Sequence, residues 1–113
     1  MIKYKCIPLS DLEHRLFLSA LSRYNKLRKY DNDWINLKRK IYPSYDGIIS
    51  PFTLSIQEKE ILRSCLELEE IICEKTMQEE GTENGEDLNK IWYNVCKKFK
   101  EAEYEEDKDK DGD

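Results

Sequence analysis

Residues 7–21 read Ile7-Pro8-Leu9-Ser10-x-x-Glu13-x-x-Leu16-Phe17-x-Ser19-Ala20-Leu21. The pattern returns in residues 52–66, which read Phe52-Thr53-Leu54-Ser55-x-x-Glu58-x-x-Ile61-Leu62-x-Ser64-Cys65-Leu66. A second pair of similar segments follows, Trp34-Ile35-Asn36-Leu37-x-Arg39-Lys40-Ile41 and Trp92-Tyr93-Asn94-Val95-x-Lys97-Lys98-Phe99. Two pairs of segments in the same order indicate that one supersecondary unit occurs twice.

Each copy begins with a helix-start signal. Ser10 with Glu13, and Ser55 with Glu58, match the S-x-x-E pattern of a capping box, in which the hydroxyl and the carboxylate each accept a backbone N–H. Apolar residues at helical spacing follow both boxes. They are Leu12, Leu16, Ala20, Tyr24 and Leu27 in the first copy, and Ile61, Cys65, Leu68 and Ile72 in the second. Each box is therefore expected to open a helix.

The repeat predicts an all-α fold in which two tandem, pseudo-symmetric helical hairpins form a small four-helix bundle with a flexible acidic C-terminal tail. Because one short hairpin is only marginally stable in water, the two hairpins are expected to share a core. The predicted segments are an extended N-terminal arm (1–8), hairpin unit 1 (9–42), a connector (43–51), hairpin unit 2 (52–103) and an acidic disordered tail (104–113).

The second helix of each unit is predicted over residues 34–42 and 86–103. Tryptophan at the same position of both copies indicates a pair of core anchors. The residues expected in the structural core are Trp34, Trp92, Leu16, Ile61, Cys65, Val95 and Phe99.

Composition fits one small, highly charged domain. The chain has 113 residues, of which 39% are hydrophobic and 38% are charged, with a net charge of −5. The charges are distributed unevenly: residues 1–51 hold ten Lys/Arg and five Asp/Glu, whereas residues 52–113 hold nine and nineteen. The 4 cysteines form no C-x-x-C pair, and no apolar run has the length of a signal peptide or membrane span. We therefore expect a cytoplasmic protein with reduced thiols and no membrane contact.

No pattern of residues predicts catalysis. The chain has no Gly-rich phosphate loop and no nucleophile elbow. Its only histidine, His14, has no metal ligand at zinc-site spacing. Residues 107–113 match the first half of a calcium loop, but the chain ends before the position of the bidentate glutamate. We predict a protein that is not an enzyme, with no catalytic residue, no metal site and no cofactor.

The predicted function is that of a small, non-enzymatic, intracellular protein-interaction module. It would act by occupying a partner surface, as regulators or inhibitors encoded by phages or mobile elements do. Two surfaces are candidates for binding a protein partner. The basic face comprises Arg23, Lys26, Arg28, Lys29, Lys38, Arg39 and Lys40, and the acidic face comprises Glu67, Glu69, Glu70 and Glu74.

Two alternatives stay open at the level of sequence. The basic face, with tyrosines interleaved, would suit a nucleic acid or a nucleotide if its residues formed one patch. The apolar stripe of the third helix, which is widened by Leu62, Leu66, Ile71 and Cys73, would suit a homodimer or a larger homo-oligomeric scaffold.

Overall fold

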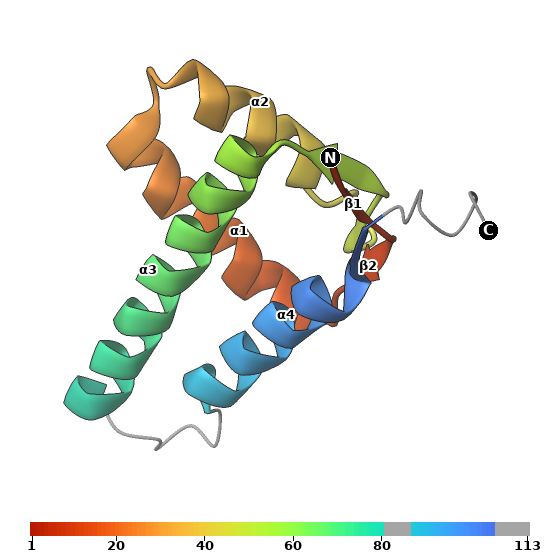
Figure 1. Ribbon diagram of the computed structural model, residues 1–113. Helices are drawn as coiled ribbons and strands as arrows, with labels where there is room; N and C mark the ends of the chain where they lie inside the picture. Colours follow the sequence, from red (N-terminus) through yellow and green to blue (C-terminus); the bar gives the residue numbers. More distant parts are fainter. Residues whose placement is uncertain (81–86, 106–113) are drawn as a thin grey trace.

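The computed structural model describes residues 1–80 and 87–105, and within them the protein is mostly helical. Its helices are α1 (Asp11–Arg28), α2 (Asn32–Ile41), α3 (Ile56–Glu80) and α4 (Leu88–Ala102). Short strands accompany them: β1 (Ile2–Tyr4), β2 (Ile7–Pro8), β3 (Ile48–Ile49), β4 (Phe52–Leu54) and β5 (Glu103–Glu105). The helices were predicted, but the strands are an element that the all-α prediction lacks. Figure 1 shows α1 crossing behind α3 and α4, with β1 and β2 near one end of the helices.

Both predicted capping boxes are present. The Ser10 amide donates to Glu13 Oε1 at 2.9 Å, and the Glu13 amide donates to Ser10 Oγ at 3.3 Å. The Ser55 amide donates to Glu58 Oε1 at 2.9 Å, and the Glu58 amide donates to Ser55 Oγ at 3.1 Å. Each box satisfies two backbone donors that the first turn of a helix leaves without partners.

The other two helices begin at aspartates. Asp31 accepts from the amides of Asp33 and Trp34, so α2 starts at Asn32, two residues earlier than predicted. Asp87 accepts from the Lys90 amide, so α4 starts at Leu88. An aspartate carboxylate is among the best N-cap groups. The position of the aspartate therefore indicates the first residue of each of these helices better than the spacing of apolar residues does.

The N-terminal arm and the connector form an antiparallel ribbon. Tyr4 lies opposite Phe52 in the β1–β4 pair, and Ile7 lies opposite Ile49 in the β2–β3 pair. Tyr4 and Ile7 are three residues apart, and so are Phe52 and Ile49. The two pairs therefore share one register. The two pairs are separated where Pro51 falls, because proline has no N–H to donate.

A third strand continues the chain from α4. β5 pairs with the other edge of β1, which gives the strand order β4-β1-β5. The start of the predicted tail is therefore ordered, since Tyr104 and Glu105 belong to this strand. The rest of that tail, 106–113, lies outside the described residues. β1 thus joins the beginning of unit 2 to its end.

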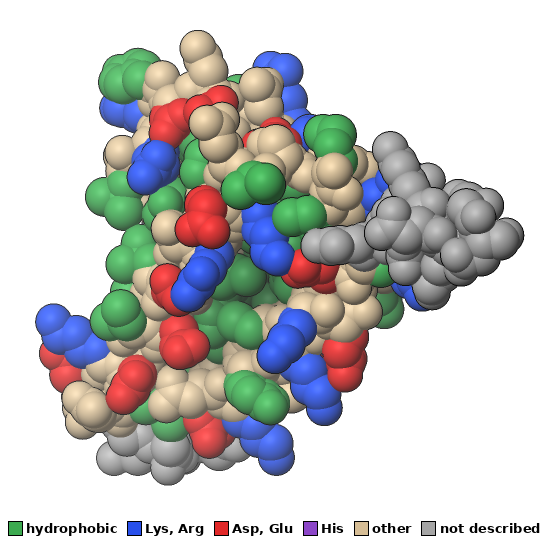
Figure 2. Space-filling view, in the orientation of Figure 1, with side chains coloured by type: hydrophobic (Ala, Val, Ile, Leu, Met, Phe, Trp, Pro, Cys, Tyr) green, Lys and Arg blue, Asp and Glu red, His purple; other side chains and the backbone are tan. Residues whose placement is uncertain are grey.

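The helices pack around one core beneath the charged surface seen in Figure 2. Trp34 and Trp92 are buried, and the Trp92 indole N–H donates to the Leu66 carbonyl at 2.9 Å. Of the other residues expected in the core, Cys65, Val95 and Phe99 are buried, and Leu16 and Ile61 are partly buried against it.

The predicted apolar stripe of α1 is partly wrong. Leu12 is 42% exposed and Leu27 is 68% exposed, whereas Phe17 and Leu21 are buried. The predicted stripe was built mostly from residues four apart, and each such step rotates the side chain by about 40° around the helix. The ends of the stripe therefore turn away from the buried face. The aromatic ring of Phe17 instead lies 5.4 Å from that of Phe99, between centroids.

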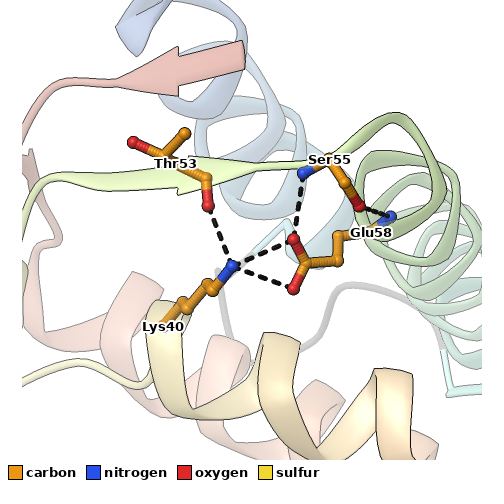
Figure 3. Close-up of polar contacts among 4 residues, drawn as sticks. All are labelled: Lys40, Thr53, Ser55 and Glu58. Carbon is orange, nitrogen blue, oxygen red and sulfur yellow. Dashed lines mark hydrogen bonds and ion pairs between the residues drawn. The ribbon is translucent and has the colours of Figure 1, made fainter. Parts of the chain in front are cut away.

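Two lysines connect the units reciprocally. Lys40 of α2 donates to both carboxylate oxygens of Glu58 at 2.9 Å, and to the Thr53 carbonyl at 3.0 Å (Figure 3). Lys98 of α4 donates to Glu13 and, at 2.8 Å, to the Pro8 carbonyl. The two lysines match each other in the repeat, as do their acceptors. The second helix of each unit therefore binds the capping box of the other unit.

These contacts change the acidity of the two glutamates. Burial alone would raise the pKa of Glu13, but hydrogen bonds from Lys98 and Ser10 outweigh it and leave the pKa below its ordinary value. The pKa of Glu58 is lowered in the same way, against burial, by Ser55 and Lys40. A lowered carboxyl pKa stabilises the folded state above the acidic range, and this stability is lost as pH falls through the folded-state pKa.

We expect K40M and K98M each to lower the free energy of unfolding by about 1–2 kcal/mol at pH 7, because each leaves a poorly exposed carboxylate without its cation. The deficit should shrink at acidic pH, where Glu13 and Glu58 become protonated. Urea unfolding at a series of pH values measures both effects. The neighbouring substitutions R39M and K97M, at exposed positions, should change stability by less than about 0.5 kcal/mol. Equal effects from all four variants would contradict this assignment.

Candidate functional site

A groove runs between α3 and α4 on the described surface. Figure 2 shows a hollow with a hydrophobic floor between rows of charged side chains. A cavity of about 490 Å³ forms one part of the groove, and its floor includes Leu62, Leu66, Cys96 and Phe99. Tyr4 of β1 also lines it. Side chains from two helices and the small sheet therefore enclose this part of the groove.

A second hollow, of about 520 Å³, continues the groove between the C-terminal part of α3 and the N-terminal part of α4. The two hollows share Glu70 and Cys96. Glu74 and Tyr93 line the second one, and the Tyr93 side chain is 66% exposed. An exposed aromatic ring beside an apolar floor is typical of surfaces that bind other proteins.

The spacing of residues along α3 explains how the sequence builds this groove. Arg63, Leu66, Glu70 and Glu74 follow one another at steps of three or four, so all of them lie on one face of the helix. The leucine lies deep in the groove and the charged residues lie at its rim. Two of the residues that widen the predicted apolar stripe of this helix, Leu62 and Leu66, line the groove.

Charge is ordered along the α3 wall of the groove. Lys59 and Arg63 lie toward the start of the helix, and Glu67, Glu70 and Glu74 follow toward its end. This order opposes the helix dipole, which favours acidic residues at the start and basic residues at the end. Interaction with the helix dipole therefore does not explain why α3 carries its charges in this order.

Ion pairs occupy part of the rim. The Lys59 ammonium lies 2.6 Å from Glu103 Oε2, and the Arg63 guanidinium lies 3.4 Å from Glu67 Oε2. The Tyr4 hydroxyl also donates to Glu103, at 3.1 Å. The first of these pairs joins α3 to β5, and the second lies along α3. The Lys59–Glu103 pair is partly buried, whereas the Arg63–Glu67 pair is exposed, and an exposed pair contributes little stability.

The predicted acidic face requires one correction. Glu67, Glu70 and Glu74 do lie together at the groove, but Glu69 is only 2% exposed and faces the interior. Its two oxygens accept from Arg23 Nη1 at 2.9 and 2.7 Å. One residue of the predicted acidic face and one of the predicted basic face therefore bind each other between α3 and α1.

Burial dominates the acidity of the groups around Glu69. It raises the pKa of the Glu69 carboxyl, although Arg23 and Cys73 oppose the shift. It also raises the pKa of Cys65 to about 12, and that of Cys73 and Cys96 to about 11, with nearby glutamates adding to each shift. These thiols are therefore protonated at neutral pH and are weak nucleophiles.

The predicted basic face is divided between two places. Lys26, Arg28 and Lys29 lie at the turn between α1 and α2, whereas Lys38, Arg39 and Lys40 lie at the far end of α2. Lys38 extends back toward α1, where its ammonium donates to Asn25, whereas Lys40 extends toward Thr53 and Glu58.

Several of these cations already have intramolecular partners. Arg28 pairs with Asp31 at 2.6 Å, and Lys38 donates to Asn25 Oδ1 at 3.0 Å. Together with Arg23 and Lys40, four of the seven predicted basic residues thus contact acceptors within the chain.

Sequence reasoning missed the contribution of α4. Cys96 and Lys100 line the groove opposite α3, but only the fold places them there. Among residues 1–80 and 87–105, no group of His, Cys, Asp and Glu side chains is arranged to hold a metal ion. Within the same residues, no helix is both long enough and apolar enough to span a membrane. The partial calcium-loop pattern lies outside the described part of the chain.

Comparisons with known proteins add no further constraint. No family model, no curated protein and no solved structure matches the chain.

We expect R23L to destabilise the protein by about 2 kcal/mol at pH 8, because it leaves the Glu69 carboxylate buried without its cation. The expected loss of stability is smaller than for a fully buried ion pair, because the Arg23 side chain is 43% exposed. A raised carboxyl pKa favours the folded state at low pH, and this contribution is lost as pH rises through the folded-state pKa. The deficit should therefore diminish on acidification, as thermal unfolding between pH 4 and 8 would show. R15L, at an exposed position of the same helix, is the control; an equal loss in both variants would contradict the role of the pair.

Proposed function

We propose that this protein is a small protein-interaction module and that the groove between α3 and α4 is its docking surface. The observation that carries the proposal is the combination of an apolar floor with a charged rim. From Lys59 to Glu74 the α3 wall extends over about four helical turns, or roughly 22 Å. An interface of that length is suited to a segment of a partner protein.

The groove would bind by burying apolar surface and would select by charge. Leu66 and Tyr93 offer apolar surface that a partner would remove from water. Glu70, Glu74 and Lys100 surround it with charges that would favour one partner over others and speed its association.

The proposal of a binding role without catalysis agrees with the structural contacts that the glutamates and thiols make. Glu13 and Glu58 are occupied in capping boxes, and Glu69 is paired with Arg23. The thiols are all free, and three of them have raised pKa values. We propose an intracellular regulator or inhibitor that acts by occupying a partner surface, of the kind that phages and mobile elements encode.

The placement of the cations favours a protein partner over a nucleic acid. A phosphate backbone calls for several cations along one surface. Of the predicted basic residues, Arg23, Arg28, Lys38 and Lys40 already contact acceptors within the chain.

We also propose that a pseudo-twofold axis relates the two hairpin units. The reciprocal contacts of Lys40 with Glu58 and of Lys98 with Glu13 support it, because a twofold axis exchanges such a pair of contacts. On this proposal the groove belongs to the longer unit 2, where the repeat has acquired a different surface.

The charge reversal E70K/E74K should weaken partner binding by at least about tenfold while leaving thermal stability unchanged. Partners recovered on the immobilised protein from cells that express it would be purified and titrated calorimetrically. The matched control is E79K/E101K, which makes the same change of charge at exposed positions of α3 and α4 away from the groove. A partner that binds both double variants as tightly as the wild type would exclude the groove as its site.

A further inference from the structure

We propose that the occupant of the groove is an amphipathic α-helix of a partner protein. We further propose that this helix runs parallel to α3, with acidic residues near its start and basic residues near its end. The inference rests on the proposed function, since it names the ligand of the same site.

The walls of the groove favour a helix over an extended strand. α3 and α4 use their backbone N–H and C=O groups within the helices, so these walls offer no edge with which a strand could pair. A bound helix satisfies its own backbone and needs from the groove only side-chain contacts. A third helix between two antiparallel ones would pack at roughly 8–10 Å from each.

The floor defines the pattern of apolar residues on the partner. Leu62 and Leu66 lie one turn apart on α3, and Cys96 and Phe99 lie less than one turn apart on α4. A helix laid between them would meet apolar surface through residues spaced i, i+4 and i+7, which form one stripe.

The rim defines the direction of the partner helix. At the end of the groove near the start of α3, Glu103 and Glu67 balance Lys59 and Arg63, and Lys100 adds a further cation that attracts acidic residues. At the opposite end Glu70, Glu74 and Asp87 outnumber Lys90, so this end attracts basic residues. A free helix is itself most stable with acidic residues in its first turns and basic residues in its last turns. Both requirements are met together only when the partner helix is parallel to α3.

A second copy of this chain could place its own α3 in the groove in only one direction. The exposed charges of α3 run from basic to acidic, so a second α3 placed parallel to the first would set like charges against each other. An antiparallel second copy would avoid that repulsion. Self-association through the groove is therefore a distinct outcome, and sedimentation of the free protein detects it.

The test uses two synthetic helical peptides of about 18 residues with identical composition and identical leucines at i, i+4, i+7 and i+11. Peptide one carries glutamates in its first two turns and lysines in its last two turns, and peptide two carries the reverse. Fluorescence anisotropy at about 0.15 M salt should show peptide one binding the wild-type protein about tenfold more tightly than peptide two, the effect of several rim contacts acting together. The variant E70K/E74K should lose this preference, and E79K/E101K should keep it.

Direction is read from a nitroxide label at the start of peptide one. It should broaden the amide resonances of Lys59 and Lys100 and leave those of Glu74 and Tyr93 sharp. Equal binding of both peptides, or broadening at the opposite end, would overturn the proposed direction. If neither peptide binds although E70K/E74K still abolishes binding of the natural partner, the docking groove stands and the helical ligand is wrong. A wild-type dimer that E70K/E74K dissociates would replace the partner helix by a second copy.

Discussion

The reciprocal contact between a lysine of one unit and the capping box of the other is the constraint on which the rest of the fold depends. Glu13 is nearly buried, and a buried carboxylate is costly unless it is paired and hydrogen-bonded. Its partners are Ser10, which is local, and Lys98, which comes from the far end of the chain. The same holds for Glu58 with Ser55 and Lys40. Neither carboxylate therefore has its cation until the distant segments have come together.

These contacts also determine where the groove lies. Lys98 attaches α4 to the start of α1, and β5 continues α4 into pairing with β1. α4 is thereby held beside α3 at the sheet, and the Trp92 indole binds the Leu66 carbonyl midway along α3. The apolar floor between the two helices remains open on the side away from α1. The groove is thus a consequence of how α4 is anchored to α1 and β1.

Much of the helical part of the fold was predictable from sequence, but less of the site was. The capping boxes and the buried tryptophans followed from short patterns. The interior position of Glu69 did not, because a glutamate among Glu67 and Glu70 carries no local sign that it faces the core. That position is decided by Arg23, which is distant in sequence and meets it only when α1 packs on α3.

By itself the sequence determined where the two long helices begin, because a capping box is made by residues three apart and needs no other part of the chain. It also determined that each unit carries a tryptophan toward the core. Only the tertiary structure decided the register of the N-terminal ribbon, the partners of Lys40 and Lys98, and the line of the groove. The physical reason is range: hydrogen bonds within one turn follow from local spacing, whereas pairs between distant segments depend on which faces pack together.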